Sequence, residues 1–494
     1  MNVLQTTSES ARVQAVPPRS FDAENHFYSK VLNAQIHPLA AFFLNLSPER
    51  IIARYCHLHP MADPRILEEL ISYKPHVLHW GGVDLLHCTT AGGKREMVVI
   101  ETNSSPSGHK SMPIPTDFDE QGSYRVLIER TFGPIISRLK PSKGVCAVLY
   151  DKNLMEVTGY AASLADHLGE EVFLVPSFES TFSQYAKFEN NYLFIRQDPS
   201  SEEWMPVRAA LRYVTQRPWN RIPVNCRTLL FNPILACLAG GRNKLLAAKA
   251  YDLFNAEIAS AGLEIRIPET MRDVPKAEVP FLVKSFGGHA VVKVPYANAG
   301  QGVFTITSPD DLAQFMEQEF QYDNFIVQSL IGNYQWSSDG ARGRFYQVGT
   351  IPSKKNRIFV ADLRMMIGAT PEGYRPVAFY ARKAKEPLVD SLEGTAATSA
   401  DMLVTNLSVK LGAEAWATDP GRLLIFDRKD FNTLGMGLDA LIDGYIQSIL
   451  AINAIDRFAV SLLNSKGRFR FKLFRSLNND EPLLNEILID GNPA

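Results

Sequence analysis

Three oxygen-bearing side chains, Asp84, Glu101 and Asn103, accompany two short apolar runs that a turn joins. The runs VDLLHC (83–88) and EMVVIE (96–101) flank TTAGGKR, whose paired glycines predict a β-hairpin. Residues two apart on a strand share a face, so Glu101 and Asn103 project together and Asp84 can reach the same point. Hard oxygen ligands on one face suit Mg²⁺, which adds water and phosphate oxygens to its shell. The alternative, which E-x-N alone favours, is a strand end with a solvated polar turn.

A lysine-bearing strand and a glycine-containing loop follow much later, in HAVVKVPYANAGQGVFTI. Glycines let backbone N–H groups approach phosphate oxygens closely, and a lysine on the adjoining strand supplies positive charge. The loop is not a Walker A motif, because GxxxxGK[ST] is absent. An ordinary hairpin with a solvated lysine is the alternative. The nucleotide-binding candidates in this stretch are Lys293, Asn298, Gly300, Gln301 and Gly302.

Two further segments could contact a nucleotide. Lys244 stands in the first turn of the helix predicted for NKLLAAKAYDLF, where a lysine is otherwise simply solvated. The run FIVQSLI (325–331), with Gln328 at its polar position, could form the hinge beneath an adenine, or equally a buried sheet strand. Arg364 in VADLRMM and Arg382 in AFYARKA lie in strand patterns. Each arginine either faces solvent or lines a cleft, where it can grip a carboxylate or phosphate in bidentate fashion.

The elements that must position these residues alternate between strands and helices. Residues 144 to about 240 read as strand, amphipathic helix and strand, which predicts a small parallel α/β unit. A helix ending at Gly262 follows, then the strands around the glycine loop and a helix capped by Ser308. IFVADLRMMIG and PVAFYARKA predict neighbouring strands, and the longest helical pattern begins at LDALIDGY. The sequence therefore predicts mixed α+β and α/β domains around one deep cleft.

Composition is that of an ordinary globular protein. The 494 residues carry a formal charge of −2, which argues against a nucleic-acid protein with a dominant basic face. Five widely spaced cysteines predict reduced thiols and a cytoplasmic location. The first twenty residues lack the apolar core of a secretory signal, and we expect no membrane span.

Together these pieces resemble the ATP-grasp superfamily. WGGVDLLHCTTAGGKREMVVIETNSSPSG is similar to the metal-binding strand pair of D-alanine–D-alanine ligases and glutathione synthetases, with Asp84, Glu101 and Asn103 on ligand positions. Lys244 and Lys293 match the two nucleotide lysines of that superfamily. The strand pair precedes the lid, an order that resembles the circularly permuted branch to which eukaryotic glutathione synthetase belongs. That branch places Arg212, or Arg217 in its stead, at a substrate-binding arginine, and Arg382 near a second one.

The resemblance implies an ATP-grasp fold, in which two α+β lobes hold ATP between them, with an additional small parallel α/β substrate domain. The expected domains are an N-terminal part of the core, an α/β substrate domain, a lid lobe and a remainder with C-terminal helices, at residues 1–140, 141–240, 241–345 and 346–494. Three departures stand out. The lid loop has no glutamate for a third metal ligand, Gly82 replaces a common arginine, and the last 80 residues resemble nothing in the family.

The function that this resemblance implies is an ATP-dependent carboxylate–amine ligase that acts through an acyl phosphate on amino acid or peptide-like substrates. Mg²⁺, or Mn²⁺ in its place, would be the metal, with no nucleic-acid or membrane partner and a homodimeric state. Arg212, Arg364 and Arg382 are the candidates for gripping the acid or the acyl phosphate. A non-catalytic nucleotide-binding protein and a small-molecule kinase are the alternatives. The residues expected to face the acceptor are Ser104, Ser105, Ser107 and His109, of which His109 could accept a proton.

Overall fold

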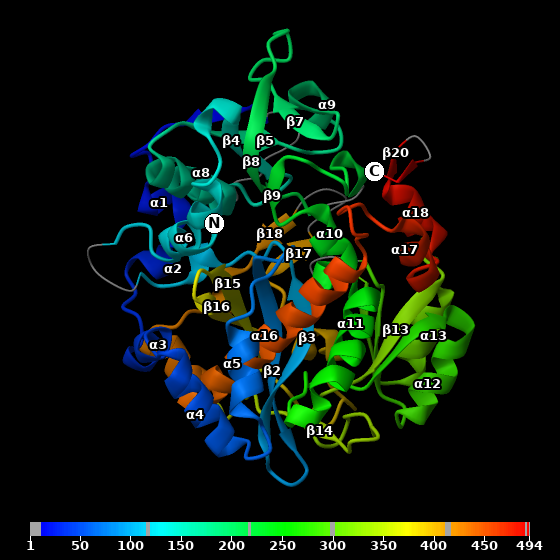
Figure 1. Ribbon diagram of the computed structural model, residues 1–494. Coiled ribbons are helices and arrows are strands. Elements are labelled where there is room, and N and C mark those ends of the chain that lie inside the picture. Colours follow the sequence, from blue (N-terminus) through cyan, green and yellow to red (C-terminus); the bar gives the residue numbers. More distant parts are fainter. Residues whose placement is uncertain are drawn as a thin grey trace.

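The computed structural model describes residues 11–114, 119–215, 219–296, 302–410, 416–489 and 492–493. These residues form three large β-sheets, of seven, six and four strands, and two small two-stranded sheets. In Figure 1 the seven-stranded sheet lies at the top, the six-stranded sheet below it, and the four-stranded sheet at the right. The predicted class, mixed α+β with a parallel α/β unit, is confirmed.

The six-stranded sheet is antiparallel and contains the predicted hairpin. Its strand order is β14-β2-β15-β16-β19, and β3 also pairs with β2, as the second strand of the hairpin. Gly93 has a φ of 81° in the hairpin turn, a conformation that glycine adopts without steric cost. The strands are β2 (Trp80–Thr90), β3 (Arg95–Asn103), β14 (Phe345–Gln347), β15 (Ala361–Thr370), β16 (Gly373–Lys383) and β19 (Leu423–Leu424).

Helix α16 (Leu438–Ser461) crosses one face of this sheet, as Figure 1 shows. Its buried side chains belong to one apolar cluster with Val83 and Leu85 of β2 and Leu363 of β15. By length and hydropathy α16 is the one helix of the described chain that could cross a membrane, contrary to the expectation of no such run. Its most apolar stretch is 83% buried against the protein, so α16 serves here as a core helix.

A buried carboxylate near the end of α16 holds the segment that leads into β2. Asp456 is fully buried, and its Oδ1 accepts hydrogen bonds from the backbone N–H groups of Val77 and Leu78, both at 2.7 Å. Its Oδ2 accepts from the Tyr73 hydroxyl at 2.8 Å and the His76 N–H at 3.1 Å. Since the N–H groups of Val77 and Leu78 are buried and cannot bond to water instead, the carboxylate fixes where β2 begins.

Replacing this acceptor is expected to destabilise the whole core. Asp456→Ala leaves buried backbone donors unpaired, so we expect the free energy of unfolding to fall by about 3–5 kcal/mol, measured by urea denaturation. The matched control is Asp439→Ala on the same helix, whose pair with Arg54 is half exposed and is worth less than about 1 kcal/mol. Equal effects of the two substitutions would contradict this account.

The seven-stranded sheet contains the predicted α/β unit. β4 (Val145–Tyr150) pairs in parallel with β5 (Val172–Pro176) and with β8 (Met205–Tyr213), which pairs in parallel with β9 (Leu229–Phe231). Helix α8 (Leu154–Leu168) makes the crossover between β4 and β5 and ends at Gly169, whose φ is 67°. The remaining strands are β1 (Gln14–Val16), β6 (Ala186–Glu189) and β7 (Tyr192–Ile195), all antiparallel to their neighbours. Because β1 pairs with β5, Gln14–Val16 lie with this sheet. The domain boundaries stay a prediction.

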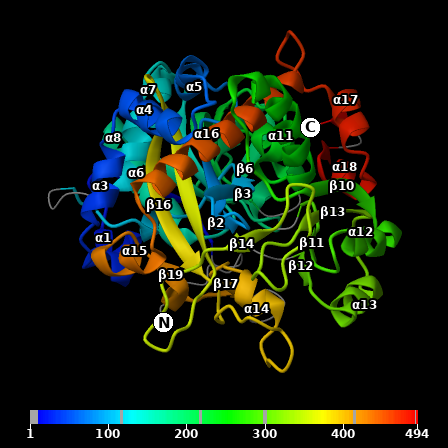
Figure 2. The same ribbon diagram turned by 90° about the horizontal axis from the view of Figure 1, so that it is seen from below.

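The four-stranded sheet belongs to the segment predicted as the lid lobe, and its strand order is β10-β13-β11-β12. Its elements are β10 (Thr270–Pro275), α12 (Val279–Ser285), β11 (Ala290–Lys293), β12 (Val303–Ile306), α13 (Pro309–Glu317) and β13 (Asn324–Ser329). Ser308 caps α13 as predicted, because its Oγ accepts from the Asp311 N–H at 3.1 Å. Helix α11 (Lys244–Ile258) precedes the lobe and continues as a 3₁₀ turn to Gly262. The C-terminal helices α17 (Phe471–Leu477) and α18 (Glu481–Glu486) lie beside this lobe (Figure 2).

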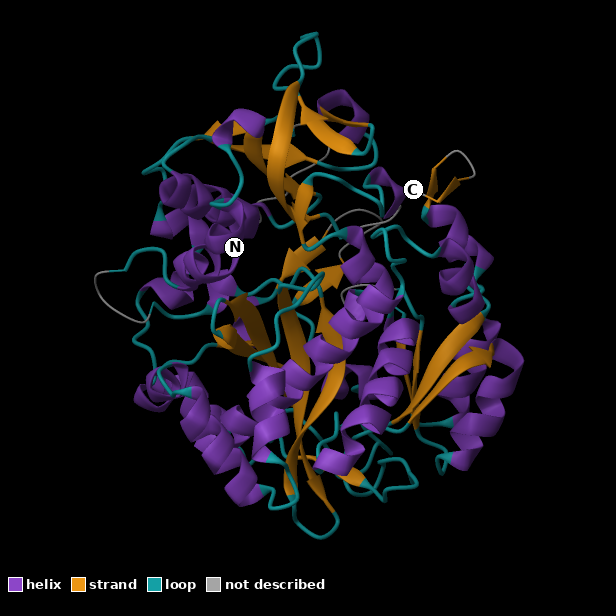
Figure 3. Cartoon of the chain, in the orientation of Figure 1, coloured by secondary structure: helices purple, strands orange, loops and turns teal. Residues whose placement is uncertain are grey.

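Shorter elements complete the described chain, and Figure 3 shows how helices surround the sheets. The helices are α1 (Ala23–His26), α2 (Ser29–Leu32), α3 (Pro38–Leu44), α4 (Pro48–Leu58), α5 (Pro64–Ile71), α6 (Ser123–Leu127), α7 (Gly133–Ile136), α9 (Phe182–Tyr185), α10 (Ile234–Ala236), α14 (Ser399–Leu403) and α15 (Arg428–Leu434). The strands are β17 (Ser408–Lys410), β18 (Trp416–Thr418), β20 (Leu488–Ile489) and β21 (Asn492–Pro493).

Candidate functional site

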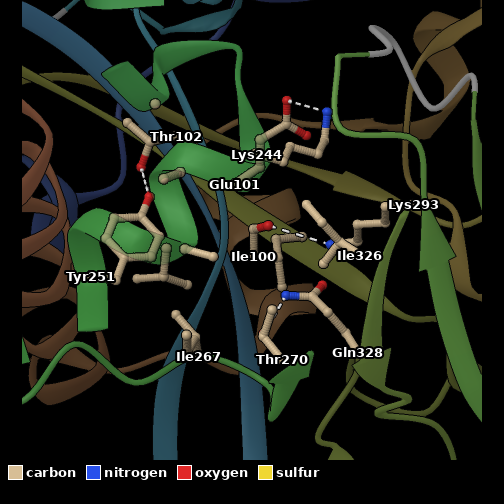
Figure 4. Close-up of a pocket in the computed structure, with 14 residues that line it drawn as sticks. Ile100, Glu101, Thr102, Lys244, Tyr251, Ile267, Thr270, Lys293, Ile326 and Gln328 are labelled. Carbon is tan, nitrogen blue, oxygen red and sulfur yellow. Dashed lines mark hydrogen bonds and ion pairs between the residues drawn. The ribbon is translucent and has the colours of Figure 1, made fainter. Parts of the chain in front are cut away.

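A pocket of about 850 Å³ lies between the six-stranded sheet and the lid lobe. The sheet contributes polar side chains, among them Asp84, Glu101, Asp362 and Arg382. The lid lobe contributes Lys293, while the apolar part of the wall comes from Leu86, Val291, Val303, Leu330, Ile331 and Leu403. A smaller hollow of about 430 Å³ adjoins it around Tyr251 and Thr102 (Figure 4). The lining of the larger pocket thus has a charged part and an apolar part.

The two predicted lysines meet in this pocket although they come from different elements. Lys244 begins α11, where the Asn243 side chain caps the helix by accepting from the Leu246 N–H at 3.1 Å. The Lys244 Nζ lies 3.6 Å from Glu101 Oε1, and the Lys293 Nζ donates to the Ile100 carbonyl at 3.4 Å (Figure 4). Both ammonium groups therefore flank the end of β3.

Burial dominates the electrostatics of Lys293. It lowers the pKa of Lys293 to about 8, and the nearby Lys244 charge acts in the same direction, against the attraction of Glu101. An anion that binds beside a desolvated ammonium and a second ammonium stabilises the charged form of both. The lysine pair is thus suited to a highly charged ligand such as a polyphosphate.

Asp84 is held by two arginines. Arg364 lies opposite Asp84 on β15, and its Nε and Nη2 donate to Asp84 Oδ1 and Oδ2 at 2.6 and 2.7 Å. Arg382 Nη2 lies 2.9 Å from Asp84 Oδ2, and Arg382 also pairs with Asp362, whose Oδ1 accepts from its Nε at 3.0 Å. Burial alone would raise the pKa of Asp84, but Arg364 and Arg382 outweigh it and hold the pKa at about 2.

This pairing bears on the predicted metal ligands. Both oxygens of Asp84 are engaged by guanidinium groups, so the structure presents Asp84 as the anchor of the arginines rather than as a metal ligand. Glu101 lies opposite Asp84 on the same face of the sheet and is 27% exposed toward the pocket. Asn103, opposite Gly82, is buried, and its Nδ2 has no hydrogen-bond partner among the described residues.

A magnesium ion fits Glu101 and Asn103 better than it fits all three predicted ligands. Mg²⁺ needs only one or two protein carboxylates when phosphate oxygens and water supply the rest. The partly exposed carboxylate of Glu101 and the amide oxygen of Asn103 would meet that requirement. The described residues hold no cluster of three His, Cys, Asp or Glu side chains suited to a metal.

Arg212, the predicted substrate arginine, is instead fully buried. Its Nε and Nη1 donate to the Asn232 and Val214 carbonyls, both at 2.5 Å, and its Nη2 donates to Ser105 Oγ at 3.0 Å. Ser104 and Ser105 are buried as well. All three nitrogens of the guanidinium are thus committed to protein oxygens that join β8, β9 and the end of β3, which leaves Arg212 a structural position in this state.

The loop after Asn103 is fixed by the buried carboxylate of Glu156 on α8. Glu156 Oε1 accepts from the N–H groups of Gly108 and His109 at 2.9 and 2.8 Å, and its Oε2 accepts from Ser107 Oγ at 3.1 Å. Ser107 is half-buried and receives a further bond from Asn153 Nδ2 at 2.9 Å.

His109 does not face the pocket as predicted. The ring is fully buried among Trp80, Tyr124 and Tyr160, and its Nδ1 shares a hydrogen with Ser123 Oγ at 2.9 Å. Burial lowers the pKa of His109 to about 4. Glu156 pulls the backbone of the loop inward, so the histidine packs in the core and is poorly placed to accept a substrate proton.

Other predicted residues divide between the pocket and undescribed parts of the chain. Gln328 lines the pocket, and its Nε2 donates to Thr270 Oγ1 at 2.8 Å. Gly302 has a φ of 66°, and its carbonyl accepts from the Val294 N–H at 2.7 Å. Three lid-loop residues and one alternative arginine lie outside the described residues: Asn298, Gly300, Gln301 and Arg217.

The sequence did not mark two charged residues, of which Asp362 lines the pocket and Lys152 lies outside its lining. Asp362 stands two positions before Arg364, so strand alternation would have placed both on one face of β15. Lys152 follows β4 in the string LYDKN, where no motif distinguishes it from a surface lysine.

No protein-family model matches the chain, and no curated protein matches it in sequence. Among solved structures it is similar to a glutathione synthetase-like effector from Globodera pallida, at 9% identity and a TM-score of 0.39, over 71% of this chain and 86% of that one. It is also similar to a RimK-domain ATP-grasp protein from Sphaerobacter thermophilus, at 12% identity and a TM-score of 0.29, over 47% and 89%. D-alanyl-alanine synthetase A from Vibrio cholerae gives 12% identity and a TM-score of 0.29, over 48% and 88%. Structural similarity at this level does not show what the pocket binds, so the function must be inferred from the residues that line it.

Proposed function

We propose that this protein is an ATP- and Mg²⁺-dependent ligase of the ATP-grasp kind that joins a carboxylic acid to an amine. The observation that carries the proposal is the pocket between two sheets where Lys244, Lys293 and Glu101 meet beside two arginines anchored by carboxylates. The low-similarity structural matches are consistent with this proposal but do not support it on their own.

The apolar part of the pocket's lining suits a purine ring. Val291 and Val303 of the lid strands, Leu86 of β2 and Ile331 after β13 supply flat apolar contact, and Gln347 Nε2 donates to the Ile331 carbonyl at 2.9 Å. A base placed there extends its phosphates toward Lys244 and Lys293. This orientation is the one in which the desolvated charge of Lys293 gains a counter-charge.

The charged part of the pocket's lining provides the groups that phosphoryl transfer requires. Lys244 and Lys293 neutralise phosphate oxygens, and Glu101 with Asn103 would hold the metal ion. When bound, Mg²⁺ supplies a Lewis acid that lowers the charge on the transferring phosphoryl group. The chain contributes position and charge, and no side-chain nucleophile is required.

Arg364 and Arg382 are the groups of this chain that suit the acid. Their guanidinium planes are fixed by Asp84 and Asp362, so little conformational entropy is lost when they orient a substrate carboxylate. A carboxylate oxygen then attacks the γ-phosphorus as the bond to ADP breaks, which gives an acyl phosphate. The amine nitrogen attacks the acyl carbon, loses a proton, and phosphate departs.

The decisive experiment measures ADP and phosphate with purified protein, ATP and Mg²⁺ against amino acids and small acids, alone and in pairs. Release that requires both an acid and an amine, together with a condensed product by mass spectrometry, supports the ligase. A phosphorylated acid without condensation would indicate a kinase. Tight ATP binding without any turnover across the screen would indicate a non-catalytic nucleotide-binding protein, which the lid loop without glutamate also allows.

A further inference from the structure

A lysine outside the pocket's lining occupies the carboxyl end of β4. Lys152 follows this strand directly, beside the parallel strand β8, and ligands of open α/β sheets bind at such strand ends. Its two chain neighbours are held in place. Asp151 Oδ2 accepts from the Thr215 N–H at 2.7 Å, and Asn153, with a φ of 63°, donates to the Tyr213 hydroxyl at 3.0 Å. The backbone therefore fixes where the Lys152 side chain starts.

The surroundings of Lys152 are positively charged. The side chain is half-buried, and Arg242, Arg364 and Lys110 all act on it electrostatically. Burial and these three cations lower the pKa of Lys152 to about 7, with Asp151 as the one opposing carboxylate. Asp151 itself is shared with Thr215 and with Arg221 Nη2, which lies 3.4 Å from its Oδ2.

The neighbouring cations have partners whereas Lys152 lacks one. Lys110 Nζ lies 3.9 Å from Glu156 Oε2, and Arg364 is paired with Asp84. Within the described part of the chain, Lys152 makes no hydrogen bond or ion pair of its own. A half-buried ammonium without a counter-ion is costly, and an anion from outside the chain removes that cost.

Arg364 connects this lysine to the pocket. Its Nε and Nη2 bond to Asp84, whereas its Nη1 points to the Ser107 carbonyl at 3.4 Å. Ser107 in turn is bonded to Asn153, the residue after Lys152. Arg364 and the residue after Lys152 thus both contact Ser107, so the carboxyl end of β4 lies close to the arginine that holds Asp84.

We propose that Lys152, with Arg364 nearby, binds a second carboxylate of the acid substrate, so that the acid is a dicarboxylate. This inference rests on the proposed ligase for its substrate but not for its site. The reacting carboxylate lies by Arg382 in the pocket, and the distal carboxylate supplies the counter-charge that Lys152 lacks. Arg212, the arginine expected to grip substrate, is committed to backbone carbonyls and leaves this role to Lys152.

The test measures the binding of succinate, glutarate and adipate by isothermal titration calorimetry, without nucleotide, against monocarboxylates of equal length. At least one dicarboxylate is expected to bind about tenfold or more tightly than its monocarboxylate. Lys152→Met should abolish that preference, whereas Lys143→Met, at an exposed lysine just before the same strand, should leave it unchanged. Inorganic phosphate that binds in a Lys152-dependent way while no dicarboxylate does would overturn the proposal.

The pH dependence provides a second readout. The ammonium of Lys152 is charged below a pKa of about 7, so dicarboxylate affinity should fall between about pH 6 and about pH 8.5 in the native protein. The Lys152→Met variant should lack that fall and should fold at least as stably as the native protein, since it removes an uncompensated charge. A dicarboxylate preference that survives Lys152→Met sinks the site.

Failure of the site and failure of the ligase are separable. Dicarboxylate binding that depends on Lys152, in a protein that releases no phosphate with any acid and amine, would sink the ligase and keep the site. Phosphate release could instead be as fast with monocarboxylates as with dicarboxylates, and binding could be unchanged in Lys152→Met. That result would contradict the proposed site and leave the proposed ligase standing.

Discussion

Glu101→Gln is expected to reduce Mg²⁺-dependent phosphate release by about 10³-fold or more, because it removes the carboxylate that faces the pocket without an arginine partner. The side chain keeps its shape and loses its charge, so ATP can still reach the lysines while the metal is held weakly. Phosphate release measured over a Mg²⁺ titration gives the result directly. A shift to much higher Mg²⁺ requirement, or a loss that Mg²⁺ cannot restore, both follow from the metal role.

The control for Glu101→Gln is Glu96→Gln. Glu96 lies on the same strand, and its Oε1 is 2.5 Å from the Lys94 Nζ near the hairpin turn. It should change phosphate release by less than about twofold, since Glu96 does not line the pocket. Thermal unfolding should show both variants folded. Native-like Mg²⁺-dependent release by Glu101→Gln would refute the metal assignment.

Asp84→Asn is expected to lower the free energy of unfolding by about 3–5 kcal/mol, because Arg364 and Arg382 would lose a shared buried counter-ion. Urea denaturation measures this change. Phosphate release should fall as well, since Asp84 would no longer hold the two guanidinium groups in position for the substrate carboxylate. A double-mutant cycle with Arg364→Gln should show strong coupling, because the pair forms a bidentate contact.

The same variant distinguishes an anchor from a metal ligand. If Asp84 bound metal, Asp84→Asn would weaken the response to Mg²⁺ and leave the stability without metal nearly unchanged. The loss of stability at low pH offers a further check on the role of Asp84. The pKa of Asp84 falls from 3.8 to about 2 on folding, so its stabilisation is complete above about pH 4 and is lost as the pH falls toward 2. That loss should be absent from Asp84→Asn.

The hairpin and the lysine-bearing elements could be predicted because their signals are local. A period of two residues placed Glu101 and Asn103 on one face of β3, and paired glycines placed the turn. Lys244 and Lys293 were marked by a helix start and by a glycine loop. These signals arise from backbone sterics and hydrogen bonding within a few residues, so they are readable without the rest of the chain.

Partnerships across the fold could not be read in the same way. The sequence predicts Asp84 as a metal ligand but does not show that β15, far along the chain, brings Arg364 directly opposite it. It also predicts Arg212 and His109 as residues that face the substrate, whereas in the structure Arg212 donates to backbone carbonyls and His109 packs among aromatic rings. Burial and charge pairing depend on which strands become neighbours, which is decided by the whole hydrophobic core.

The amino-acid sequence by itself therefore determined the elements and the residue types available for metal and phosphate: the hairpin with Glu101, the two lysines and the α/β unit. Only the tertiary structure decided how those charges are shared. It paired Asp84 and Asp362 with arginines, left Glu101 facing the pocket, and left Lys152 without an ion pair among the described residues. The physical reason is that a side chain's chemistry follows from its desolvation and nearest charges, and both are set by strand register between distant segments.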